Sequence, residues 1–156
     1  MNNKKIWIIC HYATPLKYGH GARHFLLAEE FVRSGYDVTV FASTSNFQLE
    51  KLPETKGVFT HESVNGIEVV WVKGIRYRNP AGIVRIMSWF LFSFLLLFYR
   101  PGKKSSPAIV IVSSLSLVPV INGFLYKKMH PSTQFIFEVR DIWPQTLIDI
   151  GGYSRH

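Results

Sequence analysis

The sequence predicts an α/β fold built on an open, mostly parallel β-sheet with helices on both faces. Five short apolar segments rich in β-branched residues alternate with longer segments of helical periodicity along the 156 residues. The first apolar segment, residues 5–10, is hydrophobic almost throughout, which is typical of a parallel strand covered on both faces. The length corresponds to one domain.

A strand–helix–strand unit occupies the first 42 residues. A loop that contains Gly19 and Gly21 follows the first strand. Apolar residues then recur at helical spacing from residue 22 until Ser34-Gly35 ends the predicted helix. Residues 37–42, DVTVFA, are the predicted second strand.

The later segments continue the alternation. Residues 43–65 are polar and are expected to form a long loop, whose Asn65-Gly66 turn leads into a third strand at 67–72. The remaining elements are expected in the order helix 83–99, strand 108–112, helix 115–128 and strand 134–139. With the strand order 3-2-1-4-5, the loops after Cys10, Ser113 and Val139 would meet at the carboxyl edge of the sheet, where such folds bind ligands.

Composition and charge narrow the class of protein. Hydrophobic residues make up 47% of the chain, which excludes disorder, and 18 Lys and Arg against 10 Asp and Glu give a net charge of +8. A polyanion, an anionic membrane or a phosphorylated small molecule fits this charge. The single cysteine, Cys10, excludes an intramolecular disulfide and a cysteine-based zinc site and suits a reducing cytosol. The apolar start is shorter than the core of a signal peptide, so a buried strand is expected there.

An uncharged apolar run, IMSWFLFSFLLLFY, covers residues 86–99. Fourteen helical residues rise about 21 Å, which is too short for a hydrocarbon core of about 30 Å. The flanking cations are Arg76, Arg78, Arg85, Arg100, Lys103 and Lys104. Two alternatives remain open: a core helix buried on most of its surface, or a helix that makes a peripheral membrane contact through residues 83–104. A helix with one side on protein and the other in lipid would combine them.

The loop after the first strand, HYATPLKYGHGARH, carries the first candidate site. Gly19 and Gly21 allow close approach to a ligand, and the helix that follows offers its N-terminal N–H groups to a phosphate. Arg23 and His24 lie in the first helical turn, where cations are unfavourable unless an anion is bound. The spacing is not the dinucleotide-binding fingerprint, and a simple turn with a surface Arg23 is the alternative.

Two other loops carry candidate residues. Ser114 follows the fourth strand, where its hydroxyl either caps the next helix or binds a polar ligand. After the fifth strand, Arg140 is a candidate phosphate clamp, Asp141 a candidate base or acceptor for sugar hydroxyls, and Trp143 a candidate stacking surface. An Arg140–Asp141 ion pair and a Trp143 that only packs the loop are the alternatives, and Glu138 is expected to be a paired, partly buried carboxylate.

Several activities are disfavoured. No His–Asp pairing or nucleophile elbow surrounds the serines, which argues against a serine hydrolase. The six histidines are scattered without a carboxylate pair, so no metal site is expected. The basic residues cluster beside the apolar run and form no patch interleaved with aromatic residues, so nucleic acid is not an expected partner.

Three segments together resemble the amino-terminal, Rossmann-like half of family-four retaining glycosyltransferases of the GT-B fold. They are KIWIICHYATPLKYGHGARHFLLAEEFVRSGYDVTVFAS, IVIVSSLSLVPVINGFLYKK and FIFEVRDIWPQTLIDIGGYSR. The resemblance is to the bacterial subgroup, with N-acetylfucosaminyltransferase-like members, that extends O-antigen or capsule sugars on a lipid carrier. It covers the chain apart from residues 44–66 and 75–105.

The resemblance implies an enzyme at the cytoplasmic face of the inner membrane. Such an enzyme moves a sugar from a nucleotide-sugar to a polyprenyl-diphosphate-linked acceptor without a cofactor or a metal. Gly19 and Gly21 would then lie beside the donor diphosphate and the acceptor, with Arg23 and His24 next to them. The sequence departs from the family pattern at Arg140, where relatives often have a His, and at His20, where a Gly is expected.

The same resemblance implies that residues 1–156 are the acceptor-side domain. The donor-binding domain, with its Arg/Lys diphosphate clamp and paired glutamates, would lie outside this sequence. We therefore expect the chain alone to be inactive and to need a donor-binding half, for which a separate chain is one candidate partner. The alternative is a non-catalytic remnant, or a module that docks on a membrane or on another protein.

Overall fold

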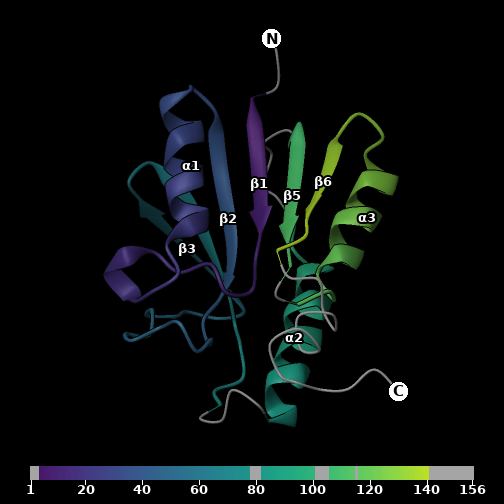
Figure 1. The fold of residues 1–156 in the computed structure, drawn as a ribbon. Coiled ribbons are helices and arrows are strands. Elements are labelled where there is room, and N and C mark those ends of the chain that lie inside the picture. The colour runs from purple at the N-terminus through teal and green to yellow at the C-terminus, as the bar shows by residue number, and fades with distance from the viewer. Residues whose placement is uncertain (1–3, 78–81, 101–105, 115, 141–156) are drawn as a thin grey trace, which may run out of the picture.

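The fold is a six-stranded sheet with the strand order β3-β4-β2-β1-β5-β6 and helices on both faces (Figure 1). The computed structural model describes residues 4–77, 82–100, 106–114 and 116–140. The strands are β1 (Lys5–Ile9), β2 (Asp37–Ser43), β3 (Phe59–Val64), β4 (Ile67–Val72), β5 (Ile109–Ser113) and β6 (Gln134–Glu138). The helices are a short 3₁₀ turn η1 (Leu16–Tyr18), α1 (Arg23–Arg33), α2 (Ile83–Leu96) and α3 (Val120–Met129).

The five predicted strands lie in the predicted order. Strand β1 pairs in parallel with β2 on one side and with β5 on the other. The parallel pairs β2–β4 and β5–β6 extend the sheet outward, so the predicted α/β class and the order 3-2-1-4-5 are confirmed. All five residues of β1 are buried, which explains its almost continuous hydrophobicity.

Alternate side chains of the central strands build a core on each face of the sheet. Ile6 and Ile8 point to the face covered by α1, where Phe25 and Ala28 are buried against them. Trp7 points to the opposite face, which α2 and α3 cover, and its ring lies 5.0 Å from the ring of Phe41. The helices therefore lie on both faces, as predicted.

Strand β3 was not predicted, because residues 43–65 were expected to form a long loop with room for a short helical turn. It pairs antiparallel with β4 over six residues, and Asn65 and Gly66 form the tight turn between the two strands with φ of 52° and 81°. Positive φ at both central residues is what a two-residue hairpin turn requires. The β3 sequence, FTHESV, has no apolar face of its own and gains its order from pairing with β4.

Two helix boundaries also differ from prediction. Helix α3 begins at Val120 rather than at Leu115, because Pro119 disfavours helical backbone in the residue before it. Ser114 therefore lies outside the helix, so of its two alternative roles the helix cap is wrong and the binding of a polar ligand stays a prediction. Helix α2 ends at Leu96, and tighter bonds such as Phe98 N–H to the Leu95 carbonyl continue the turn.

Helix α2 packs on the sheet with one side only. Ser88, Phe92 and Ser93 are its buried residues, and the Ser93 carbonyl accepts a hydrogen bond of 2.8 Å from Asn122 of α3. The opposite side of α2 is exposed, so the expected alternative of a core helix buried on most of its surface is wrong. Within the described ranges, the structure contains no helix with both the length and the apolar character needed to cross a bilayer.

Gly123 sets how closely α3 approaches the sheet. A Cβ atom at this position would lie 2.4 Å from Phe135 Cε2 and 2.7 Å from Val112 Cγ2. Gly→Ala in a helix interior ordinarily stabilises by about 1 kcal/mol, but overpacking a core costs about 1–3 kcal/mol. We predict that Gly123→Ala lowers the free energy of unfolding by about 1–3 kcal/mol in urea titrations, whereas the exposed Lys128→Ala in the same helix changes it little. A stabilised Gly123→Ala protein would contradict the packing described.

Candidate functional site

The loop after β1 is held on the sheet by backbone and side-chain contacts. Its residues 10–15 are buried, and the Ser43 N–H at the end of β2 donates to the His11 carbonyl at 3.2 Å. After η1, the chain pairs with the segment that follows β2, where the His20 N–H donates to the Gln48 carbonyl at 2.9 Å. The loop therefore leaves the carboxyl end of β1 along a defined path.

Gly19 and Gly21 lie against Gln48. A Cβ atom on Gly19, which has φ of 151°, would lie 2.2 Å from the Gln48 carbonyl oxygen, and one on Gly21, which has φ of 91°, would lie 2.1 Å from Gln48 Oε1. At Gly19 the neighbour is backbone, so close approach within the chain requires a glycine without any ligand. At Gly21 the neighbour is the end of a flexible side chain, and the positive φ is what favours glycine. Their assignment as ligand-binding residues stays a prediction.

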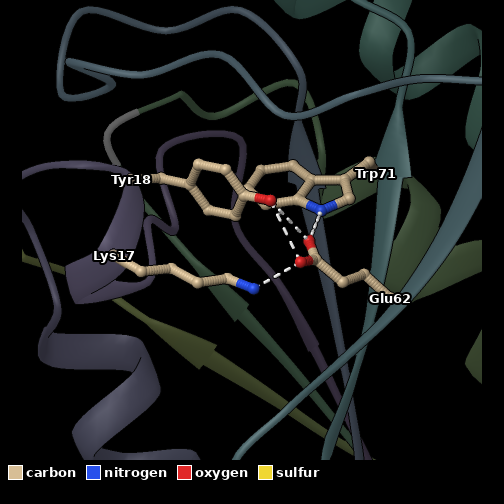
Figure 2. Close-up of polar contacts among 4 residues, drawn as sticks. All are labelled: Lys17, Tyr18, Glu62 and Trp71. Carbon is tan, nitrogen blue, oxygen red and sulfur yellow. Dashed lines mark hydrogen bonds and ion pairs between the residues drawn. The ribbon is translucent and has the colours of Figure 1, made fainter.

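Glu62 of β3 holds η1 from the other side, as Figure 2 shows. The Lys17 ammonium pairs with Glu62, the Tyr18 hydroxyl donates to it at 3.0 Å, and the Trp71 indole N–H donates at 2.7 Å. Burial alone would raise the pKa of Glu62, but these three donors outweigh it and hold that pKa below its ordinary value. Glu62 is not among the predicted site residues, because the segment that forms β3 was expected to be a loop.

An open recess of about 260 Å³ lies beside this cluster, with Tyr18, Lys51, His61 and Glu62 among its lining residues. None of the predicted site residues lies in its lining within the described part of the chain. The recess is therefore separate from the site that the sequence predicts.

Tyr12 is a second anchor of the loop, and it attaches the loop to α2. The Arg85 Nε–H donates to the Tyr12 hydroxyl at 2.9 Å, and the Trp89 indole N–H donates to it at 2.6 Å. The Arg85 guanidinium also lies over the rings of Tyr12, Phe47 and Trp89. Arg85 therefore points into the protein, which corrects its expected place among the cations that flank the apolar run.

Three loops converge at the carboxyl edge of β1, β5 and β6, as the topology predicted. The Ser114 N–H donates to the Glu138 carbonyl at 3.0 Å, and the Arg140 N–H donates to the Ser114 hydroxyl at 2.9 Å. From the start of α1, the Arg23 guanidinium pairs with the Glu138 carboxylate, and His24 Nε2 lies 3.7 Å from Glu138 Oε2. Four predicted site residues, Arg23, His24, Ser114 and Arg140, thus come together around Glu138.

The expected pairing of Glu138 is confirmed, with Arg23 as the partner. Asp141 and Trp143 lie outside the described residues, so their roles stay predictions. Burial alone would raise the pKa of Glu138, but the Ser113 hydroxyl and the Arg23 guanidinium outweigh it and keep that pKa below its ordinary value. Glu138 is therefore an ionised partner for Arg23 at neutral pH and a weak proton acceptor.

His24 is buried with unused hydrogen-bonding capacity. It is 2% exposed, and both ring nitrogens, like Glu138 Oε2, lack a hydrogen-bond partner among the described residues. Burial, reinforced by the nearby Arg140 charge, lowers the pKa of His24 to about 4. The first turn of α1 has no side-chain cap within the described chain. The site therefore combines two cations, uncapped helix N–H groups and a neutral buried imidazole.

Comparison with known proteins adds no family. No protein-family model matches the sequence, and no curated protein matches it significantly. The class that the structure defines is a Rossmann-like α/β fold. Among the described residues, no group of three or more His, Cys, Asp or Glu side chains is placed to hold a metal ion.

We predict that Glu62→Gln lowers the free energy of unfolding by about 1–3 kcal/mol, because an amide cannot serve the three donors that now share the carboxylate. Since the folded-state pKa of Glu62 lies below its ordinary value of 4.5, its contribution is present above that pH and is lost as the pH falls through the folded-state pKa. Urea titrations at neutral and acid pH measure both effects. The exposed Glu54→Gln is the control, and equal losses in the two variants would contradict the role of Glu62.

The buried histidines predict a second pH dependence. The folded-state pKa values of His24 and His11, about 4 and about 3, lie below the ordinary value of 6.5. Their contribution to stability is therefore present above pH 6.5 and is lost as the pH falls from 6.5 toward the folded-state values, by up to about 3 kcal/mol for His24.

We expect His24→Phe to remove its share of this loss in urea titrations between pH 8 and pH 5. The exposed His20→Gln leaves both buried rings in place and is expected to keep the loss. An imidazole titration by NMR should give His24 a midpoint near pH 4. A midpoint near 6.5 would contradict the burial described.

Proposed function

We propose that this chain is the acceptor-side half of a glycosyltransferase, which moves a sugar from a nucleotide-sugar to a polyprenyl-diphosphate-linked saccharide. The observation that carries the proposal is the convergence of Arg23, His24, Ser114 and Arg140 at the carboxyl edge of the sheet. In a doubly wound fold this edge, where the strand order reverses, is where ligands bind. The reaction class, glycosyl transfer, comes from the resemblance of three sequence segments to family-four glycosyltransferases.

The chemistry of the edge suits a diphosphate. Two guanidinium groups and the uncapped N-terminus of α1 stabilise negative charge, which develops on the leaving diphosphate during glycosyl transfer. Arg23 is shared with Glu138, so a bound diphosphate would compete with that carboxylate for the guanidinium. The neutral His24 ring offers hydrogen bonding without added charge.

The proposed place of the reaction is the cytoplasmic face of the inner membrane, where the lipid-linked acceptor is displayed. Donor recognition belongs to the second half of the proposed enzyme, on this chain's continuation or on a partner chain. In this scheme the transfer is a front-face or ion-pair-like substitution, in which the cations stabilise the leaving group and no metal is required.

We predict that the chain binds inorganic pyrophosphate and a short-chain polyprenyl diphosphate in calorimetric titrations. Arg23→Gln and Arg140→Gln should each weaken binding by about tenfold or more, because each removes a charge-assisted hydrogen bond. The control is Arg33→Gln at the other end of α1, where Arg33 pairs with Glu30 at 2.8 Å in solvent.

Absence of diphosphate binding, or equal weakening by Arg33→Gln, would contradict the proposed site and favour a non-catalytic module. Sugar transfer by the 156-residue chain by itself would contradict its assignment as one half of the enzyme.

A further inference from the structure

The positive charge of the chain is confined to one part of the sequence. Residues 69–137 contain nine Lys and Arg and no Asp or Glu. The rest of the chain contains nine Lys and Arg against ten Asp and Glu, so it is close to neutral. The net charge of +8 therefore arises entirely from this acid-free segment.

The acid-free segment supplies both helices on one face of the sheet. It contains α2 and α3, which pack on the face opposite α1, and its Arg76, Arg100 and Lys128 are exposed. Glu68 of β4 lies on the same sheet face, where it accepts a hydrogen bond from Thr39. The helix on the other face, α1, contains two glutamates and two arginines. The α2 and α3 helices therefore carry cations without acidic residues, and the carboxylate of Glu68 on that face comes from the sheet.

The outward side of α2 is apolar. Ile83, Met87, Phe90 and Phe94 recur at helical spacing on the side opposite the buried Phe92, and each is more than half exposed. A surface helix ordinarily turns polar residues outward. This exposed apolar stripe therefore indicates a surface that binds an apolar partner. On α3, Ile121 and Phe124 are also exposed.

We propose that the outward side of α2 docks on an anionic lipid bilayer. In this arrangement α2 lies in the plane of the interface, with Phe90 and Phe94 among the acyl chains and exposed cations of the acid-free segment at the headgroups. A helix of 14 residues is too short to span a bilayer but suits this placement. A second copy docked through α2 would bring the cations of two acid-free segments together, whereas anionic headgroups neutralise those of one.

Helix α2 carries the docking surface and also contacts the loop that leads to the candidate site. On its inner side, α2 holds the loop after β1 through the Arg85 and Trp89 bonds to Tyr12 and through a 3.0 Å hydrogen bond between Ser88 and His11. A bilayer on the outer side would therefore lie one helix diameter from the loop that leads to Arg23. The docking itself needs neither an acceptor nor glycosyl transfer, so its test is independent of the proposed function.

The test is flotation of the purified 156-residue chain with vesicles of phosphatidylcholine alone and of phosphatidylcholine mixed with phosphatidylglycerol. We expect binding to the anionic vesicles, weaker binding to the neutral ones, and release as salt screens the headgroups. Phe90→Glu/Phe94→Glu should reduce binding by about tenfold or more, because it places charges among the acyl chains. Leu26→Glu/Leu27→Glu, which changes exposed leucines of α1 on the opposite face, should leave binding unchanged.

A second variant, Arg76→Glu/Arg100→Glu, leaves the apolar stripe intact and should weaken binding to anionic vesicles alone. Thermal unfolding checks that each variant remains folded. The proposal is overturned if the parent chain does not float with anionic vesicles, or if the Phe90/Phe94 and Leu26/Leu27 variants bind alike. It is also overturned if sedimentation shows that the Phe90/Phe94 change dissociates a dimer while vesicle binding is unaffected, since the occupant would then be a second copy.

Discussion

The parallel pairing of β1 with β2 on one side and β5 on the other determines where the rest of the molecule lies. A parallel strand in the middle of a sheet must be covered on both faces, and its connections must cross over the sheet to reach the next strand. Helix α1 therefore covers one face, while α2 and α3 cover the other. The same arrangement brings the loops after β1, β5 and β6 together, because all three strands end at one edge. The cluster around Glu138 is thus a consequence of the topology.

Helix α2 is apolar on both its inner and its outer side. Its inner side buries Phe92 and also carries Ser88 and Arg85, which bond to His11 and Tyr12, while its outer side carries Phe90. The Ser88 and Arg85 contacts hold the loop after β1. The outer side of α2 is both apolar and exposed, and an exposed apolar surface of this kind marks an interaction site. The acid-free segment that contains α2 is the basis for proposing anionic lipid as the partner of this side.

Local sequence patterns were sufficient to predict five strands, their order and the two longer helices. Buried strands and helix ends can be recognised from the apolar and turn-forming residues within a short segment. Strand β3 escaped prediction because FTHESV lacks an apolar face, and its order comes from pairing with β4. The topology predicted that the loops after β1, β5 and β6 meet at the carboxyl edge. It did not predict the ion pairs and hydrogen bonds that hold these loops together. The Arg23–Glu138 pair joins residues 115 positions apart, and the Lys17–Glu62 pair joins residues 45 apart, so no local spacing reveals them.

The glycine loop shows how the same residues support two physical explanations. A glycine is required wherever backbone must approach another group closely, whether that group is a phosphate or the protein itself. Gln48 supplies the close contact for both Gly19 and Gly21, so the glycines by themselves carry no argument for a ligand. Other groups at this edge have unused hydrogen-bonding capacity. Among the described residues, the ring nitrogens of buried His24 and the second oxygen of Glu138 have no hydrogen-bond partner, and they lie with Arg140 at the edge where parallel sheets bind their ligands.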